Sequence, residues 1–259
     1  MSKELEKYLA SYLVGLDVVY QKGNEKKKYT YSSFPMSVGT DWILVTAGHC
    51  LEEVEKLRNQ YSILSTRLVD FTGTGNELSY ALPFSIPDDL IFANNIGNDF
   101  EDLKFDCGFL LLPNLIKLGL EANKVRAFEI QNAFDGTRLN FEFDRICVLG
   151  LPDRDDLKSS GRTKRVEFAT PYLVPIDDVS AIDPASLVGV ARSPEIPIYG
   201  ISGGPWVGIN EIDNGYEIAL LGIQSRKTEN GRKVFANRID SFARTLIRRL
   251  GILAQQDRD

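Results

Sequence analysis

The chain has 259 residues, of which 43% are hydrophobic and 25% charged, as in an ordinary globular protein with a substantial core. Its net charge of −6 and pI near 5.1 give no general electrostatic footprint for a phosphate backbone, so nucleic-acid binding is not expected. No run approaches the roughly 18 apolar residues of a membrane span, and the first residues lack the basic and apolar regions of a signal peptide.

The cysteines indicate the compartment. Three of them stand far apart, without CxxC spacing, at positions 50, 107 and 147. An odd number of scattered thiols suits a reducing environment. The sequence therefore predicts a cytoplasmic protein with free thiols and no membrane association.

The first half of the chain reads mainly as strands, after a short helix over residues 2–13 with leucines spaced four apart. Turn signals at 23–24 and 39–41 divide residues 14–45 into strands and hairpins. Apolar residues at positions 51, 54 and 57 predict about two helical turns. Further strand-like runs are expected at 62–70, 79–84 and 105–112.

The second half repeats this pattern of short strands after a crossing segment near 113–124. Strands are expected at 125–130, 139–150, 164–174, 187–191, 205–210, 216–224 and 233–237. A C-terminal helix is expected to be capped by Asp240 or Ser241 and to end with Gly251 at the C′ position. Many short strands separated by turns indicate an all-β sandwich or barrels.

His49 is the only histidine of the chain. It follows the apolar run 42–46 and the small residues Ala47 and Gly48, which let the backbone turn and present the imidazole. A lone histidine is by itself more often structural or surface-exposed than catalytic. A single histidine also excludes a multi-histidine metal site, and the cysteine spacing does not compensate, so no metal is expected.

Ser202 lies in a glycine-rich segment, Tyr199-Gly-Ile-Ser-Gly-Gly-Pro-Trp206. Glycines permit positive φ angles and close approach by a substrate backbone. Acyl transfer needs such a place, where a hydroxyl stands beside N–H donors aimed at a developing oxyanion. Gly200 and Ser202 are the natural donors. A simple glycine-rich β-turn is the competing interpretation of this segment alone.

Asp106 leads directly into an apolar run, Cys107-Gly-Phe-Leu-Leu-Leu112. A carboxylate there is costly to bury without a partner, and an imidazole N–H would be one. An aspartate at a strand edge facing water is the alternative. Asp102 is a competitor, which Leu103 and Lys104 separate from the apolar run.

Taken together, the three segments resemble the signature segments of trypsin-like, chymotrypsin-fold serine peptidases. They are Thr46-Ala-Gly-His-Cys50, Phe105-Asp-Cys-Gly-Phe-Leu-Leu111 and Gly200-Ile-Ser-Gly-Gly-Pro205, in that family's order of His, Asp and Ser. Val148-Leu-Gly-Leu-Pro152 and Leu220-Leu-Gly-Ile-Gln-Ser225 are similar to further strands of the family. The resemblance spans roughly residues 14–250.

The resemblance implies two packed antiparallel six-stranded β-barrels, with a short N-terminal helix and a C-terminal helix. Residues 1–120 would form the half that carries His49 and Asp106, and residues 121–259 the half that carries Ser202. Ser202 would be the nucleophile, His49 the general base and Asp106 its orienting partner. The amides of Gly200 and Ser202 would form the oxyanion hole, and no cofactor would be needed.

The segment Val148-Leu-Gly-Leu-Pro152 resembles bacterial members, and two departures from the family pattern indicate an intracellular member without the usual activation cut. Ile201 stands where zymogen members carry an aspartate, and Cys50 has no cysteine in the expected partner region near Phe34. By alignment to the family, Ile196 would form the floor of the primary pocket. Its wall would include Ser225, Arg226 and Lys227, with Lys233 approaching from the next strand, which disfavours Lys or Arg at the cleaved position.

The expected activity is therefore serine endopeptidase, acting on protein or peptide substrates. A catalytically silent trypsin-like binding module, an esterase-type acyl hydrolase and a non-catalytic sandwich with chance motifs are the alternatives. An intracellular protease is hazardous unless it is restricted, which leaves room for a regulatory protein partner that no residue identifies.

Overall fold

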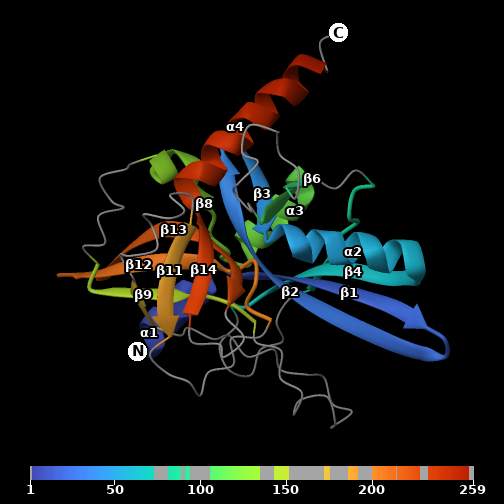
Figure 1. The fold of residues 1–259 in the computed structure, drawn as a ribbon, viewed down its shortest axis with the longest axis horizontal. Helices are drawn as coiled ribbons and strands as arrows, with labels where there is room; N and C mark the ends of the chain where they lie inside the picture. The colour runs from blue at the N-terminus through green and yellow to red at the C-terminus, as the bar shows by residue number, and fades with distance from the viewer. Residues whose placement is uncertain are drawn as a thin grey trace.

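The chain folds into an eight-stranded sheet and a closed six-stranded barrel, with helices around them (Figure 1). The structure is a computed structural model and describes residues 2–72, 81–88, 91–93, 106–134, 143–151, 172–175, 186–191, 200–213, 215–227 and 233–256. It is mainly β, as the sequence predicts.

The sheet of the first half has the strand order β5-β4-β1-β2-β3-β7-β6, and β8 pairs with β2. The bounds are β1 (Val14–Lys22), β2 (Glu25–Val38), β3 (Asp41–Thr46), β4 (Ser62–Asp70), β5 (Ala81–Pro83), β6 (Ile91–Ala93), β7 (Cys107–Leu112) and β8 (Phe128–Glu129). Neighbours are antiparallel except β2 and β8, which run parallel.

This half differs from the expected six-stranded antiparallel barrel. It has eight strands, one parallel pair and, among the described strands, no ladder that joins β5 to β6. The length of β2, 14 residues, accounts for part of the difference. Its first part pairs with β1 as far as Ser33, and from Phe34 onward it pairs with β3 and β8.

The second half is the closed antiparallel barrel, in the order β10-β11-β14-β13-β12-β9. Its strands are β9 (Arg145–Val148), β10 (Tyr172–Pro175), β11 (Ser186–Ala191), β12 (Pro205–Ile212), β13 (Gly215–Lys227) and β14 (Lys233–Arg238). Six strands and closure agree with the expectation for this half. The barrel places Ser202 immediately before β12.

The described residues form four α-helices, α1 (Lys3–Ala10), α2 (Gly48–Gln60), α3 (Asn114–Ala122) and α4 (Ile239–Gln256), besides a short 3₁₀ helix, Ile130–Phe134. Helical structure was expected near both chain ends and after His49, whereas α3 lies in the segment expected as a crossing between the halves. The turns predicted after His49 form the longer α2. The expected end at Gly251 is wrong, because α4 continues through it. An interior glycine costs about 1 kcal/mol relative to alanine, which a docked helix tolerates. Among the described helices, none is both long and apolar enough to cross a membrane.

The helix α1 is part of the core. Ser2 caps it by accepting from the Leu5 amide at 3.1 Å. The side chains of Leu5 and Leu9 are fully buried in one cluster with Phe34 of β2, Ile223 of β13 and residues of α4. The first residues of the chain therefore stabilise the contact between the two halves.

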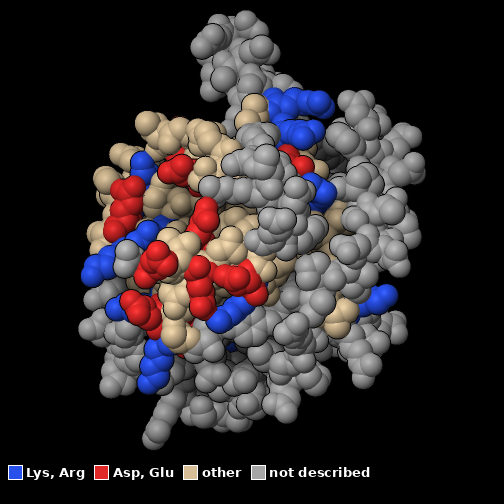
Figure 2. All heavy atoms as spheres, turned by 90° about the vertical axis from the view of Figure 1, so that its left-hand side faces the viewer, with Lys and Arg blue, Asp and Glu red and all other residues tan. Residues whose placement is uncertain are grey.

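The surface that carries β9 and β12 is acidic at its centre. Figure 2 shows this side of the molecule, the left-hand side of Figure 1, where Asp and Glu side chains gather between smaller groups of Lys and Arg. Arg145 pairs with Glu211 there at 2.7 Å, which neutralises part of the local charge. This face does not favour a polyanionic ligand.

Candidate active site

His49 lies in the first turn of α2, directly after β3. Two small residues, Ala47 and Gly48, make the change from strand to helix. A Cβ on Gly48 would lie 3.1 Å from Asp106 Oδ1 and 3.0 Å from the Cys107 carbonyl oxygen. The missing side chain at Gly48 thus allows the strand that carries Asp106 to approach the helix start.

Asp106 holds His49 through both carboxylate oxygens. Oδ1 accepts from the His49 backbone amide at 2.8 Å, and Oδ2 lies 2.7 Å from His49 Nδ1. Asn237, which is buried in β14, donates its side-chain amide to the Asp106 carbonyl oxygen. The aspartate is therefore fixed from both halves of the molecule, and it directs the proton of the imidazole to Nδ1.

Ser202 stands in a tight turn before β12. Gly203 has φ +87°, and its amide donates to the Gln224 carbonyl at 2.8 Å. The Gly204 amide donates to the Ile201 carbonyl at 3.0 Å. A Cβ at Gly203 would lie 2.1 Å from Thr46 Oγ1, and one at Gly204 would lie 1.8 Å from the Leu149 carbonyl oxygen. A side chain at Gly203 or Gly204 would clash with neighbouring atoms, so glycine is required at both positions. A β-turn alone does not explain this requirement.

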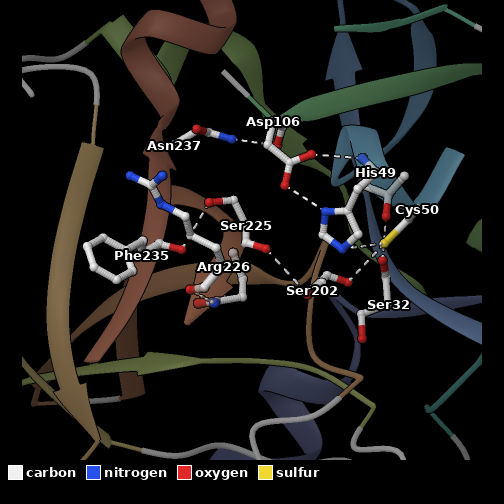
Figure 3. Close-up of polar contacts among 11 residues, drawn as sticks. Ser32, His49, Cys50, Asp106, Ser202, Ser225, Arg226, Phe235 and Asn237 are labelled. Atoms are coloured by element: carbon white, nitrogen blue, oxygen red, sulfur yellow. Dashed lines mark hydrogen bonds and ion pairs between the residues drawn. The ribbon is translucent and has the colours of Figure 1, made fainter. Parts of the chain in front are cut away.

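The structure brings His49, Asp106 and Ser202 together, with His49 between the other two (Figure 3). The Ser202 hydroxyl, however, donates to the Ser225 carbonyl at 3.5 Å. His49 Nε2 instead faces the Cys50 thiol, with Sγ at 3.6 Å, and that thiol also donates to the Ser202 carbonyl at 3.8 Å. Hydrogen bonds between a catalytic base and its nucleophile are often loose without substrate.

The pKa of His49 is raised from 6.5 to about 10, first by its hydrogen bond with Asp106 and then by its contact with Cys50, while burial opposes the shift. A general base must be neutral, so we expect kcat/KM to rise with pH and to level off well above pH 7. A pH profile of peptide hydrolysis measures this directly. A profile that levels off below pH 6.5 would contradict it.

The raised pKa of His49 also makes the stability of the fold depend on pH. Because the pKa of folded His49 lies above its unfolded value near 6.5, the pair with Asp106 stabilises the fold fully below that pH. The contribution declines as the pH rises toward the folded pKa. Unfolding curves and activity are therefore best compared at one fixed pH.

The segment before Ser202 has the form expected of an oxyanion site. Gly200 has φ +83°, a backbone conformation that glycine adopts without strain. Within the described part of the chain, neither the Gly200 amide nor the Ser202 amide makes a hydrogen bond. Ile201 between them is buried and packs against Gly150, where a Cβ would lie 2.5 Å from that of Ile201.

The residues expected to line the specificity pocket are only partly placed. Ile196 lies outside the described residues. Ser225 is buried in β13, and its carbonyl faces the Ser202 hydroxyl. Arg226 is exposed, and its guanidinium lies over the ring of Phe235, 4.9 Å from the centroid, away from Ser202 (Figure 3). Lys227 ends β13.

Two contacts of the site could not be read from the three motifs. Cys50, which the sequence predicts only as a free thiol, contacts both His49 Nε2 and the Ser202 carbonyl oxygen. Asn237 lies outside the three motifs. It is the polar residue that follows the apolar run Val234-Phe-Ala of β14, and it binds the Asp106 carbonyl oxygen. A buried asparagine needs partners for its amide, and this is the signal that could have found it.

Comparisons with known proteins relate the chain through its fold alone. No protein-family model matches the sequence, and neither does any curated protein. The solved structure of GrC superposes with a TM-score of 0.56 at 13% identity, over 93% of this chain and 95% of the other. The fold is chymotrypsin-like.

Two further solved structures superpose with lower TM-scores. The thermostable serine protease AL20 from an extremophilic microorganism has a TM-score of 0.49 at 16% identity, over 90% of this chain and 94% of its own. Protease Anisep from Arthrobacter nicotinovorans has a TM-score of 0.47 at 16% identity, over 88% and 90%. Activity must therefore be inferred from the chemistry of the site itself.

Proposed function

We propose that this protein is a serine endopeptidase that uses Ser202, His49 and Asp106. One observation carries the proposal: the only histidine of the chain donates two hydrogen bonds to Asp106, from its backbone amide and from Nδ1, beside a serine in a glycine turn. The three residues come from distant parts of the sequence, and a structural role for any one of them would not require the others. The chymotrypsin-like fold supports peptide substrates.

In the proposed reaction, His49 Nε2 takes the Ser202 hydroxyl proton while Oγ bonds to the scissile carbonyl carbon. The carbonyl oxygen becomes an oxyanion, which the Gly200 and Ser202 amides bind. The C–N bond then breaks, and the proton on Nε2 passes to the leaving amine. A water molecule then attacks the acyl carbon while His49 Nε2 takes its proton. The bond between Oγ and the acyl carbon breaks, the acid product leaves, and the proton on Nε2 returns to Ser202 Oγ.

The catalytically silent module is the second candidate, because the Ser202 hydroxyl contacts Ser225 and not His49. A fluorophosphonate probe separates the two, since it labels a serine only when base and oxyanion site both act on it. We expect the native protein to be labelled and Ser202→Ala to be unlabelled. Absence of labelling across the pH range in which His49 is neutral would favour the silent module.

The proposed enzyme does not need an N-terminal cut. In activation by insertion, the new N-terminus made by a cut enters the protein, and its α-ammonium pairs with a buried aspartate next to the nucleophile. In this chain the buried Ile201 occupies the position of that aspartate. An ammonium inserted there would be desolvated without a partner. Apolar packing of Ile201 instead holds the turn that carries Ser202. The leucines of α1 are already buried in the core.

We therefore expect stepwise truncation from Ser2 to Val14 to destabilise the protein and not to activate it. Each buried leucine lost from a core costs about 2–5 kcal/mol, and α1 and the three residues after it supply three, Leu5, Leu9 and Leu13. Thermal unfolding and probe labelling of each truncation measure the two effects. A sharp gain in labelling at one new N-terminus, abolished by acetylating that amine, would refute this mechanism.

For specificity, we expect poor cleavage after Lys or Arg. Ile196 at the pocket floor would offer no carboxylate, so a cationic side chain would lose hydration without compensation. Cleavage profiling of a peptide library, with Ser202→Ala as the blank, gives the preference. Dominant cleavage after Arg would show that the pocket is aligned incorrectly.

A further inference from the structure

Ser32 lies at the junction of the two halves and contacts the segment before the nucleophile. It sits on β2, where the ladder with β1 is about to give way to the ladder with β3, and it is fully buried. Its hydroxyl donates to the Gly200 carbonyl at 2.9 Å and accepts from the Leu151 amide, also at 2.9 Å. One hydroxyl thus connects the sheet to two loops of the barrel half.

The backbone of Ser32 is held as firmly as its side chain. Thr46, the last residue of β3, donates its hydroxyl to the Ser32 carbonyl at 2.8 Å. A Cβ on Gly203 would lie 2.4 Å from that same carbonyl oxygen and 2.1 Å from Thr46 Oγ1. The turn that carries Ser202 therefore rests directly on Ser32 and Thr46.

The Gly200 carbonyl has a particular significance for the oxyanion site. It belongs to the peptide unit between Gly200 and Ile201, and the two amides proposed to bind the oxyanion stand on either side of that unit. Rotation of this unit would tilt both donors away from a common point. Glycine gives the backbone freedom to rotate, so the observed conformation, with φ +83°, has to be selected by contacts from outside the loop.

We propose that Ser32 is a positioning residue, whose hydroxyl fixes the Gly200–Ile201 peptide and so keeps the oxyanion donors of Gly200 and Ser202 in place. This inference rests on the proposed function. Ser32 does not touch substrate, so its effect should appear where negative charge develops on the substrate oxygen. Ground-state binding should change little.

Ser32→Ala tests the proposal, and Ser33→Ala is its matched control. Ser33 is the next residue on β2, is equally buried, and donates its hydroxyl to the Val14 carbonyl at 2.6 Å, away from the nucleophile. Ser32→Ala loses two buried hydrogen bonds and Ser33→Ala loses one, so both should have a lower melting temperature. Direct loss of an oxyanion donor lowers kcat by about 10²–10³-fold. For the indirect role of Ser32 we expect a loss of about 10- to 100-fold.

The expected pattern is a lower kcat with nearly unchanged KM for Ser32→Ala, and both parameters near wild type for Ser33→Ala. The rate of fluorophosphonate labelling should fall in parallel with kcat. If Ser32→Ala does not fold, Ser32→Cys keeps the shape with a weaker donor, and its kcat should be intermediate.

Three outcomes would overturn the proposal: wild-type kcat in Ser32→Ala, wild-type kcat in Ser32→Cys, or equal losses in the two alanine variants. The proposed function fails separately, if Ser202→Ala still turns over peptide or if the native protein is never labelled. A native protein that is labelled, together with a fully active Ser32→Ala, would reject the role of Ser32 alone.

Discussion

Replacement of Ser202 by alanine is expected to lower kcat by about 10⁶-fold, and replacement of His49 by alanine should have nearly the same effect. The two side chains act as a unit, since the histidine has no proton to take once the hydroxyl is gone. The double variant should therefore lose little beyond the worse single variant. Steady-state hydrolysis of a peptide taken from the cleavage profile measures all three.

Ser202→Ala should fold normally. Within the described residues, the hydroxyl of native Ser202 makes a single hydrogen bond, at the long distance of 3.5 Å, so little is lost with it. Thermal unfolding close to that of wild type provides the control. Strictly additive losses in the double variant would mean that Ser202 and His49 act in separate steps. Near-normal turnover by purified Ser202→Ala would refute the mechanism.

Asp106→Asn should lower kcat by about 10⁴-fold, the size of the effect in the general triad template. The asparagine carbonyl can still accept from the His49 amide. Its NH₂ group would then face His49 Nδ1, where Oδ2 now lies at 2.7 Å. That arrangement directs the imidazole proton to Nε2, which can no longer accept the proton of Ser202.

A shift in the pH profile accompanies this loss. The hydrogen bond with Asp106 is the main cause of the raised pKa of His49, so the midpoint of the profile should move down toward about 6.5. Asp102→Asn is the control, since Asp102 was the competing candidate in the sequence. A larger loss in Asp102→Asn than in Asp106→Asn would show that the wrong aspartate has been assigned.

The sequence predicted the parts of the fold that local pattern controls. The leucine spacing before Val14 became α1, and turn residues at 23–24 and 39–41 separate β1, β2 and β3. The order of motifs predicted a chymotrypsin-like arrangement, and the likeness to GrC agrees with it at the level of the fold. The helix and the turns depend on residues close together in the chain, whereas the arrangement of the halves was implied by the resemblance to chymotrypsin-fold peptidases.

What the sequence could not predict depends on long-range pairing. The parallel contact between β2 and β8 joins residues about ninety positions apart, and no hydrophobic periodicity in either segment predicts it. The same holds for the contact of Cys50 with Ser202, because a thiol next to a histidine in sequence has no defined direction. Ser32 reads as an ordinary strand serine until its partners Gly200 and Leu151 are known.

The burial of α1 also bears on how the molecule is made. Leu5 and Leu9 are synthesised before every strand of the two halves, whereas their cluster partners Ile223 and Phe242 belong to β13 and α4. The first half can form its strands early, but these leucines stay without their final neighbours until β13 and α4 have been made. Docking of α1 is thus coupled to synthesis of the second half. The candidate active site also waits for that half, which supplies Ser202 and the Asn237 side chain that binds the Asp106 carbonyl.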